Sequence, residues 1–201
     1  MTISWYGEAC FLLESSSTRV LIEPPLKESG LASPRLKSDI LIETRNKKQE
    51  TRSEDGATFS IDSPGEYEIK GVNISGIGDG ENTIYTIEMD GIKVTHLGFL
   101  KKELNNEKLE LIGNPDIVIV PVGGFKDELF EAEAAMKLIN KIEPKIAIPM
   151  LYDVKGLKVK RAPLVNFIKE SEAKNSPVPK LTIKKKDLTE EETKIVILEK
   201  V

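Results

Sequence analysis

The chain is poor in the residues that most often build metal and redox sites. Its 201 residues include one histidine, His96, and one cysteine, Cys10. A single cysteine excludes an intramolecular disulfide, which is typical of proteins in a reducing compartment. Cys10 lies in the apolar run of residues 9–13, and this setting predicts core packing rather than nucleophilic chemistry.

Long apolar runs are also missing. No stretch approaches the roughly 18 apolar residues of a membrane-spanning helix, and no basic-then-apolar leader opens the chain. We therefore expect a cytoplasmic protein without a membrane partner. The formal net charge is −4. This charge argues against nucleic acid as a partner, because proteins that bind polyanions carry a basic surface.

The length predicts a single domain over residues 1–201. Most of the first half reads as short strands rich in β-forming residues, interrupted by turns. Asp90-Gly91 between apolar Met89 and Ile92 predicts a tight hairpin. Residues 43–56 are almost entirely polar and predict an exposed loop. The expected strands are 2–6, 9–14, 19–22, 39–42, 57–61, 66–69, 72–77, 82–89 and 92–96.

The second half alternates between strands and helices. Gly113 suits the end of one helix, Asp127 suits the N-cap of the next, and Pro163 suits the first turn of a third. This order favours an α/β fold in which sheets carry helices on the outside. The expected helices are 103–112, 128–142 and 163–173, and the expected strands are 116–120, 145–149, 180–184 and 193–199.

Several short motifs, in matching order over residues 2 to about 153, resemble the metallo-β-lactamase superfamily. The resemblance is to the branch of ascorbate-phosphate lactonases and other zinc-dependent hydrolases. It implies an αββα sandwich, with two mixed sheets, helices on the outer faces and a metal site at one edge. The motifs are Trp5-Tyr6-Gly7-Glu8-Ala9, Leu21-Ile22-Glu23-Pro24, Ser63-Pro64-Gly65-Glu66-Tyr67, Thr95-His96-Leu97-Gly98-Phe99, Pro121-Val122-Gly123-Gly124 and Pro149-Met150-Leu151-Tyr152.

The metal-binding positions of that branch carry other residues here, with one exception. His96 keeps its identity. Glu8 stands where the branch has histidine, Glu23 where it has aspartate, Phe99 where it has an acidic residue and Leu151 where it has histidine. The main metal motif falls on residues 44–50 and places Arg45, Lys47, Gln49 and Glu50 at the ligand positions.

These replacements argue against the zinc centre of the family. Catalytic zinc takes about three protein ligands of the imidazole, thiolate or carboxylate type. Arginine cannot be such a ligand, because it stays protonated in proteins. We therefore expect no metal and no cofactor. A site for a hard cation built from Glu8, Glu23 and Glu50 remains an alternative.

Charge compensation offers a different role for the replaced positions. Buried carboxylates that lose a cation need another positive partner. Arg45 or Lys47 is therefore expected to form ion pairs with Glu8, Glu23 or Glu50. The alternative is that residues 43–56 form an ordinary solvated loop.

Three functions remain open from the sequence. The first is a catalytically inactive pseudoenzyme with an interaction or structural role, as a homo-oligomer or with another protein. The second is a hydrolase that works without the usual dinuclear zinc, with His96 as a candidate catalytic residue. The third is a protein that binds a small anion in the cleft where the family has its active site. His96 can equally be a hydrogen-bonded histidine at a strand end.

Overall fold

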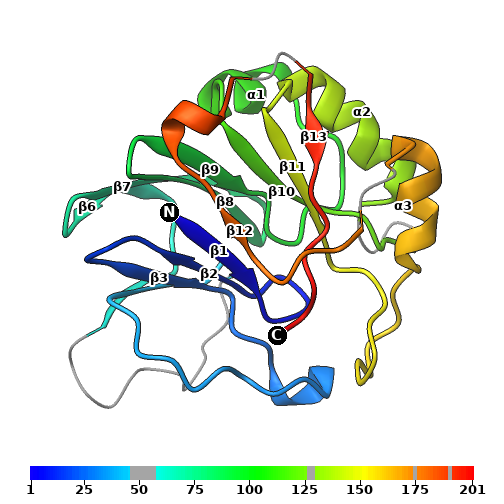
Figure 1. Cartoon of the computed structure of the whole chain (residues 1–201), viewed down its shortest axis with the longest axis horizontal. Coiled ribbons are helices and arrows are strands. Elements are labelled where there is room, and N and C mark those ends of the chain that lie inside the picture. Colours follow the sequence, from blue (N-terminus) through cyan, green and yellow to red (C-terminus); the bar gives the residue numbers. More distant parts are fainter. Residues whose placement is uncertain (46–57, 126–129, 174–175, 190–191) are drawn as a thin grey trace.

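The chain folds into two β-sheets that pack face to face, with the α-helices on the far side of one of them (Figure 1). The computed structural model describes residues 1–45, 58–125, 130–173, 176–189 and 192–201. Both sheets are mixed, because each contains parallel and antiparallel neighbours. The expected sandwich of two mixed sheets is confirmed.

The first sheet, sheet A, has six strands in the order β12-β1-β2-β3-β4-β5. Strands β1 to β3 form an antiparallel meander, and β3, β4 and β5 run parallel. The strands are β1 (Thr2–Trp5), β2 (Phe11–Glu14), β3 (Arg19–Ile22), β4 (Ile40–Ile42), β5 (Phe59–Ile61) and β12 (Leu181–Thr182).

The second sheet, sheet B, has seven strands in the order β13-β11-β10-β9-β8-β7-β6. The predicted hairpin at Asp90-Gly91 joins β8 to β9, with Met89 opposite Ile92. Strands β9, β10, β11 and β13 run parallel. The strands are β6 (Gly65–Ile69), β7 (Val72–Asp79), β8 (Asn82–Met89), β9 (Ile92–His96), β10 (Ile117–Pro121), β11 (Ile146–Met150) and β13 (Lys194–Ile195).

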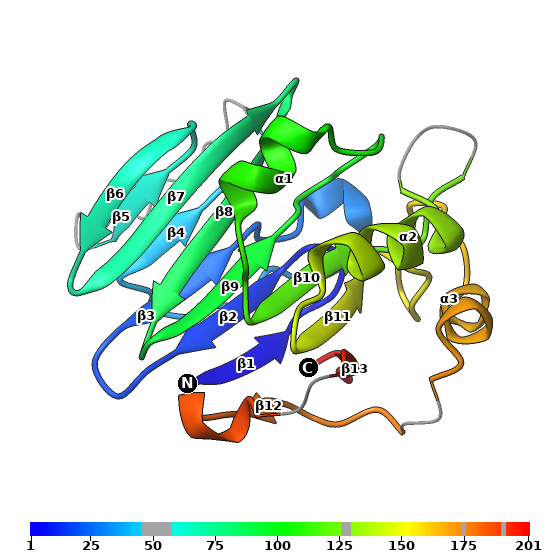
Figure 2. The ribbon, with the colours of Figure 1, turned by 90° about the horizontal axis from the view of Figure 1, so that it is seen from above.

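Three α-helices lie on the side of sheet B that faces away from sheet A (Figure 2). They are α1 (Asn106–Ile112), α2 (Ala132–Ile142) and α3 (Leu164–Ser171). Gly113 ends α1 and Pro163 precedes α3, as the sequence predicts. Helix α2 begins later than expected, and Asp127, its predicted cap, lies outside the described residues. None of the helices in the described ranges is long and apolar enough to cross a membrane.

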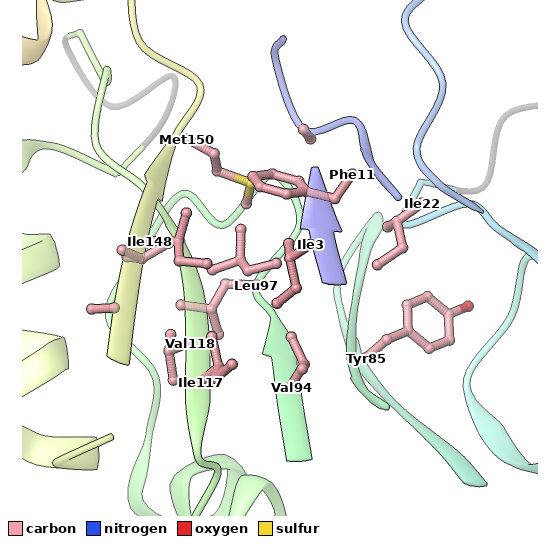
Figure 3. Close-up of a cluster of buried hydrophobic side chains, with 14 of the residues drawn as sticks. Ile3, Phe11, Ile22, Tyr85, Val94, Leu97, Ile117, Val118, Ile148 and Met150 are labelled. Carbon is pink, nitrogen blue, oxygen red and sulfur yellow. The ribbon is translucent and has the colours of Figure 1, made fainter. Parts of the chain in front are cut away.

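The main core fills the space between the two sheets. Ile3, Phe11 and Ile22 of sheet A face Val94 and Ile148 of sheet B across this space (Figure 3). Alternation along each strand of sheet A sends every second side chain inward, so short strands still bury an apolar face. This core holds the two sheets together and so fixes the edge of the sandwich that carries the candidate site described below.

The outer face of sheet A is covered by a smaller apolar cluster. Cys10, Leu12, Leu21 and Leu41 are buried there, and Tyr6 and Leu36 pack against them. Leu36 belongs to the connection between β3 and β4, which contains a single 3-10 turn, η1 (Lys27–Ser29). Burial raises the pKa of the Cys10 thiol, so the thiolate is disfavoured and the predicted packing role is confirmed.

Helix α1 provides a test of local structure. The Asn105 side chain accepts a hydrogen bond from the backbone N–H of Lys108 at 3.0 Å and so caps the helix. Asn105→Ala is expected to lower the free energy of unfolding by about 1 kcal/mol, measured by urea denaturation. Asn106→Ala, one residue further on, removes the same side chain without removing the cap. Equal losses in the two variants would contradict the capping role.

Candidate active site

Four of the replaced family positions meet at one edge of the sandwich. Glu8, Glu23 and Arg45 follow β1, β3 and β4, whose carboxyl ends lie at the same edge because these strands run in one direction. Phe99 follows β9 of the facing sheet. Together with Ala9, residues 24–26, residues 28–29, Val159 and Arg161, these residues line a cavity of about 170 Å³. Four of the family positions that the sequence singles out therefore line one cavity.

Glu23 is held by donors on both carboxylate oxygens. Oε2 accepts hydrogen bonds from the backbone N–H of Thr44 at 2.7 Å and from its hydroxyl at 2.9 Å. Oε1 accepts from Arg45 Nε at 2.9 Å and from Nη2 at 2.6 Å. The Glu23 side chain is only 7% exposed, so this is a buried charge that its neighbours satisfy. The predicted ion pair between Arg45 and Glu23 is thus present.

Arg45 also stacks on Phe99. Its guanidinium carbon lies 3.4 Å from the centroid of the Phe99 ring, a cation–π contact. Asn82 on β8 orders both partners: it pairs with Arg45 in an isolated bridge and accepts a hydrogen bond from Phe99 N at 2.8 Å. Its amide also donates to the Leu97 carbonyl at 3.0 Å. A phenylalanine at the acidic family position therefore serves as a platform for the arginine.

Glu8 has a partner that the sequence did not indicate. Arg161 binds it with both prongs of the guanidinium, Nε to Oε1 at 3.1 Å and Nη2 to Oε2 at 2.7 Å. Both side chains are about one-tenth exposed or less. The two residues are 153 positions apart, and Arg161 lies beyond the motifs that carry the family resemblance. No local pattern distinguishes it from the lysines around it.

His96 is completely buried below this edge. Its Nδ1 accepts a hydrogen bond from the backbone N–H of Gly98 at 3.1 Å, so Nε2 carries the proton and donates to the Ala9 carbonyl at 3.0 Å. Burial lowers its pKa to about 4, which keeps the ring neutral. A catalytic role for His96 stays a prediction, and it would require one of these two bonds to break.

The backbone at this edge is strained at three positions that the family motifs single out. Glu8, Glu23 and Leu151 have positive φ angles of 49°, 44° and 58° although none is glycine. Of the other positive-φ residues of this kind in the described ranges, Lys70 and Asp90 lie in hairpin turns and Glu143 and Glu172 end helices. Such strain costs about 1–3 kcal/mol per residue and concentrates at functional sites.

Further contacts hold Leu151 in this conformation. Its N–H donates to the Glu8 carbonyl at 3.3 Å. Its own carbonyl lies against Gly123, where an added Cβ would come within 2.0 Å of the oxygen, so only glycine fits. The glycine in the 121–124 motif is thus explained by close backbone approach. Leu151 is thus linked to the site by its backbone N–H, which binds the Glu8 carbonyl.

The described residues do not fit a zinc centre as they are arranged. Both ring nitrogens of His96 are engaged, and Glu8 and Glu23 are each paired with an arginine. Within the described ranges, no three histidine, cysteine, aspartate or glutamate side chains are grouped so that they could hold a metal ion. Lys47, Gln49 and Glu50, the other predicted positions, lie outside those ranges, as does most of the loop predicted over 43–56.

Comparison with known proteins supports the resemblance. Residues 2–151 match the family model described as "Beta-lactamase superfamily domain". A candidate zinc-dependent hydrolase of the metallo-β-lactamase superfamily from Thermotoga maritima superposes with a TM-score of 0.83 at 30% identity, covering 98% of both chains. Igni18, a metallo hydrolase from Ignicoccus hospitalis, shares the fold with a TM-score of 0.66 at 17% identity, covering 98% of this chain and 94% of Igni18.

The curated relatives correct one expectation. A protein of Thermoplasma acidophilum named "UPF0173 metal-dependent hydrolase" is 25% identical, with 76% of this chain and 84% of the relative covered. A relative from Archaeoglobus fulgidus with the same description is 26% identical, with the same coverage. These names contradict the expectation that no metal cofactor is used. That expectation was wrong because it rested on ligand identities at the family positions alone.

Proposed function

Because the chain belongs to the metallo-β-lactamase superfamily, we propose that it is a hydrolase whose substrate binds in the cavity between Glu8, Glu23, Arg45 and Arg161. The relatives named metal-dependent hydrolases extend this proposal to a metal-dependent activity. A metal at the family position would have to compete with Arg45 and Arg161 for the two carboxylates.

One observation carries this proposal. Three strained backbone positions, Glu8, Glu23 and Leu151, persist at the edge where the family has its active site. An ordinary loop would relax such conformations, since each costs folding free energy. Retained strain therefore supports a site that still needs this backbone shape. The bulky and charged side chains that replace the family's metal ligands change the chemical groups at the site but leave its backbone conformation unchanged.

The carboxylates have different roles in this proposal. Glu23 has four donors on its two oxygens, which hold it as a fixed negative charge that orients Arg45. Among the described residues, the Glu8 carboxylate receives hydrogen bonds from Arg161 alone, through one donor on each oxygen, and so keeps acceptor capacity towards the cavity. We assign Glu8 as the group that orients or deprotonates a reacting water molecule, and Arg45 as the group that faces an anionic part of the substrate.

The experiment is a turnover screen on the purified chain. Lactones, phosphodiesters and thioesters are each offered with Zn²⁺, with Mn²⁺ and after chelation, and bound metal is measured in parallel. We expect hydrolysis of at least one class, and a loss of about 100-fold or more in Glu8→Gln, as for removal of a general base. Glu14→Gln, which alters a partly exposed glutamate paired with Arg19, is the matched control. A screen without turnover under any condition contradicts the proposal.

A second candidate is a non-catalytic member of the superfamily that binds a small anion or a protein partner. The observation that favours it is that Glu8 and Glu23 are each already neutralised by an arginine. Its expected signature is a ligand-dependent rise in melting temperature without turnover, because binding to the native state alone stabilises it. Light scattering on the same sample tests whether the protein is a homo-oligomer.

For both candidate functions we propose the cytoplasm as the location of the protein, because a single buried free cysteine is compatible with a reducing compartment.

A further inference from the structure

The cavity is too small for an ordinary substrate in the observed arrangement. Its volume of about 170 Å³ is well below the roughly 300–1,000 Å³ typical of small-molecule sites. At about 30 Å³ per water molecule, it accommodates on the order of five waters. Movement of one wall would enlarge the cavity to the size that a small-molecule substrate needs.

The wall best suited to movement is the segment of residues 153–163, which we call the strap. It leaves β11 and runs to α3, the yellow segment between these elements in Figure 1. It contains no helix or strand, and most of its side chains up to Lys160 are exposed. It contributes Val159 and Arg161 to the cavity lining. Segments with few buried apolar contacts open locally at low free-energy cost.

Few contacts hold the strap down. At its base, Asp153 N donates to the Ala162 carbonyl and Ala162 N to the Gly123 carbonyl, both at 3.0 Å. Towards its tip, Lys158 N donates to the Ser29 carbonyl at 2.8 Å. The base bonds anchor its ends, so they can persist when the tip lifts. Between base and tip, two charged contacts are seen in the described residues: the bidentate pair of Arg161 with Glu8, and the Lys160 ammonium 4.9 Å from the centroid of the Phe125 ring.

We infer that the strap is an opening wall of the substrate cavity and that the Arg161–Glu8 pair is its latch. This inference rests on the proposed function for the identity of the cavity as a substrate site. The latch has a consequence that does not depend on enzyme activity. Breaking the Arg161–Glu8 pair increases the fraction of molecules in which residues 154–161 are detached from the cavity. Removing one partner of a pair this well buried leaves the other charge unpaired, which costs far more than the same change in an exposed pair, so the substitution can shift that equilibrium strongly.

Limited trypsin digestion tests the latch without any substrate. Cleavage requires local detachment of the chain, and Lys155, Lys158 and Lys160 provide sites within the strap. Glu8→Gln keeps the side-chain volume and every tryptic site, and we expect cleavage after these lysines to be faster by about tenfold or more. Arg161→Gln breaks the latch from the other side and is expected to behave alike. Fragments are identified by mass spectrometry.

The controls separate a latch from general destabilisation. Glu14→Gln disturbs a partly exposed glutamate–arginine pair on β2 and β3, away from the strap, and is expected to leave strap cleavage unchanged. Near-UV circular dichroism verifies that each variant is folded. Unchanged strap cleavage in both folded latch variants would overturn the inference, as would acceleration spread evenly along the chain. A failed turnover screen with accelerated strap cleavage would reject the hydrolase and leave the strap in place.

Discussion

Glu23→Ala is expected to lower the free energy of unfolding by about 3–5 kcal/mol, the usual cost of removing one partner from a buried charge pair. The substitution leaves the Arg45 guanidinium without its carboxylate and the Thr44 N–H and hydroxyl without their acceptor. Each unsatisfied group adds a desolvation penalty. Urea denaturation followed by circular dichroism measures the loss.

Two variants sharpen this prediction. Glu14→Ala removes a partly exposed glutamate that also pairs with an arginine, Arg19, at 3.0 Å, and a loss of no more than about 1 kcal/mol is expected. Glu23→Gln keeps the volume and one carbonyl oxygen, so it should fall between the two alanine variants. If Glu23→Ala costs no more than Glu14→Ala, the carboxylate at the cavity is not a structural charge and the description of the site is wrong.

Acid is expected to destabilise the fold through His96. The ring titrates with a pKa of about 4 when folded, against a usual value near 6.5 when unfolded. Between these values the unfolded chain binds the proton and the native chain does not, so stability is full above pH 6.5 and falls as the pH is lowered to 4. The total loss corresponds to about 3 kcal/mol at 1.36 kcal/mol per pKa unit.

The measurement is the free energy of unfolding at several pH values from 7 to 4. His96→Gln lacks the titrating ring and should lose the extra slope in this window, although its stability at pH 7 is lower because two buried hydrogen bonds are disturbed. Asp39 also affects stability, but in a different pH range. Its hydrogen bonds from Lys70 and from the backbone N–H of Arg19 lower its pKa, so the stability it contributes is lost only at a pH more acidic than the His96 window. Parallel pH profiles for the wild type and His96→Gln would refute the role of His96.

Much of the framework was predictable because its causes are local. The Asp90-Gly91 turn between two apolar strands, the apolar run around Cys10, the end of α1 at Gly113 and the start of α3 after Pro163 all depend on a few neighbouring residues. The order of the motifs then predicted the sandwich and placed Glu8, Glu23, Arg45 and Phe99 at one edge. The pairing of Arg45 with Glu23 followed from opposite charges at neighbouring family positions.

The rest depended on how distant segments meet. Helix α2 begins four residues after its predicted start, because an apolar period does not define where the chain leaves the preceding loop. The partner of Glu8 is contributed by the strap, 153 residues away, and the size of the cavity depends on how closely the strap approaches β1 and η1. Periodicity and turn chemistry report on a residue and its chain neighbours. Which guanidinium neutralises a given buried carboxylate is decided only when the packing of the two sheets brings their connecting segments together.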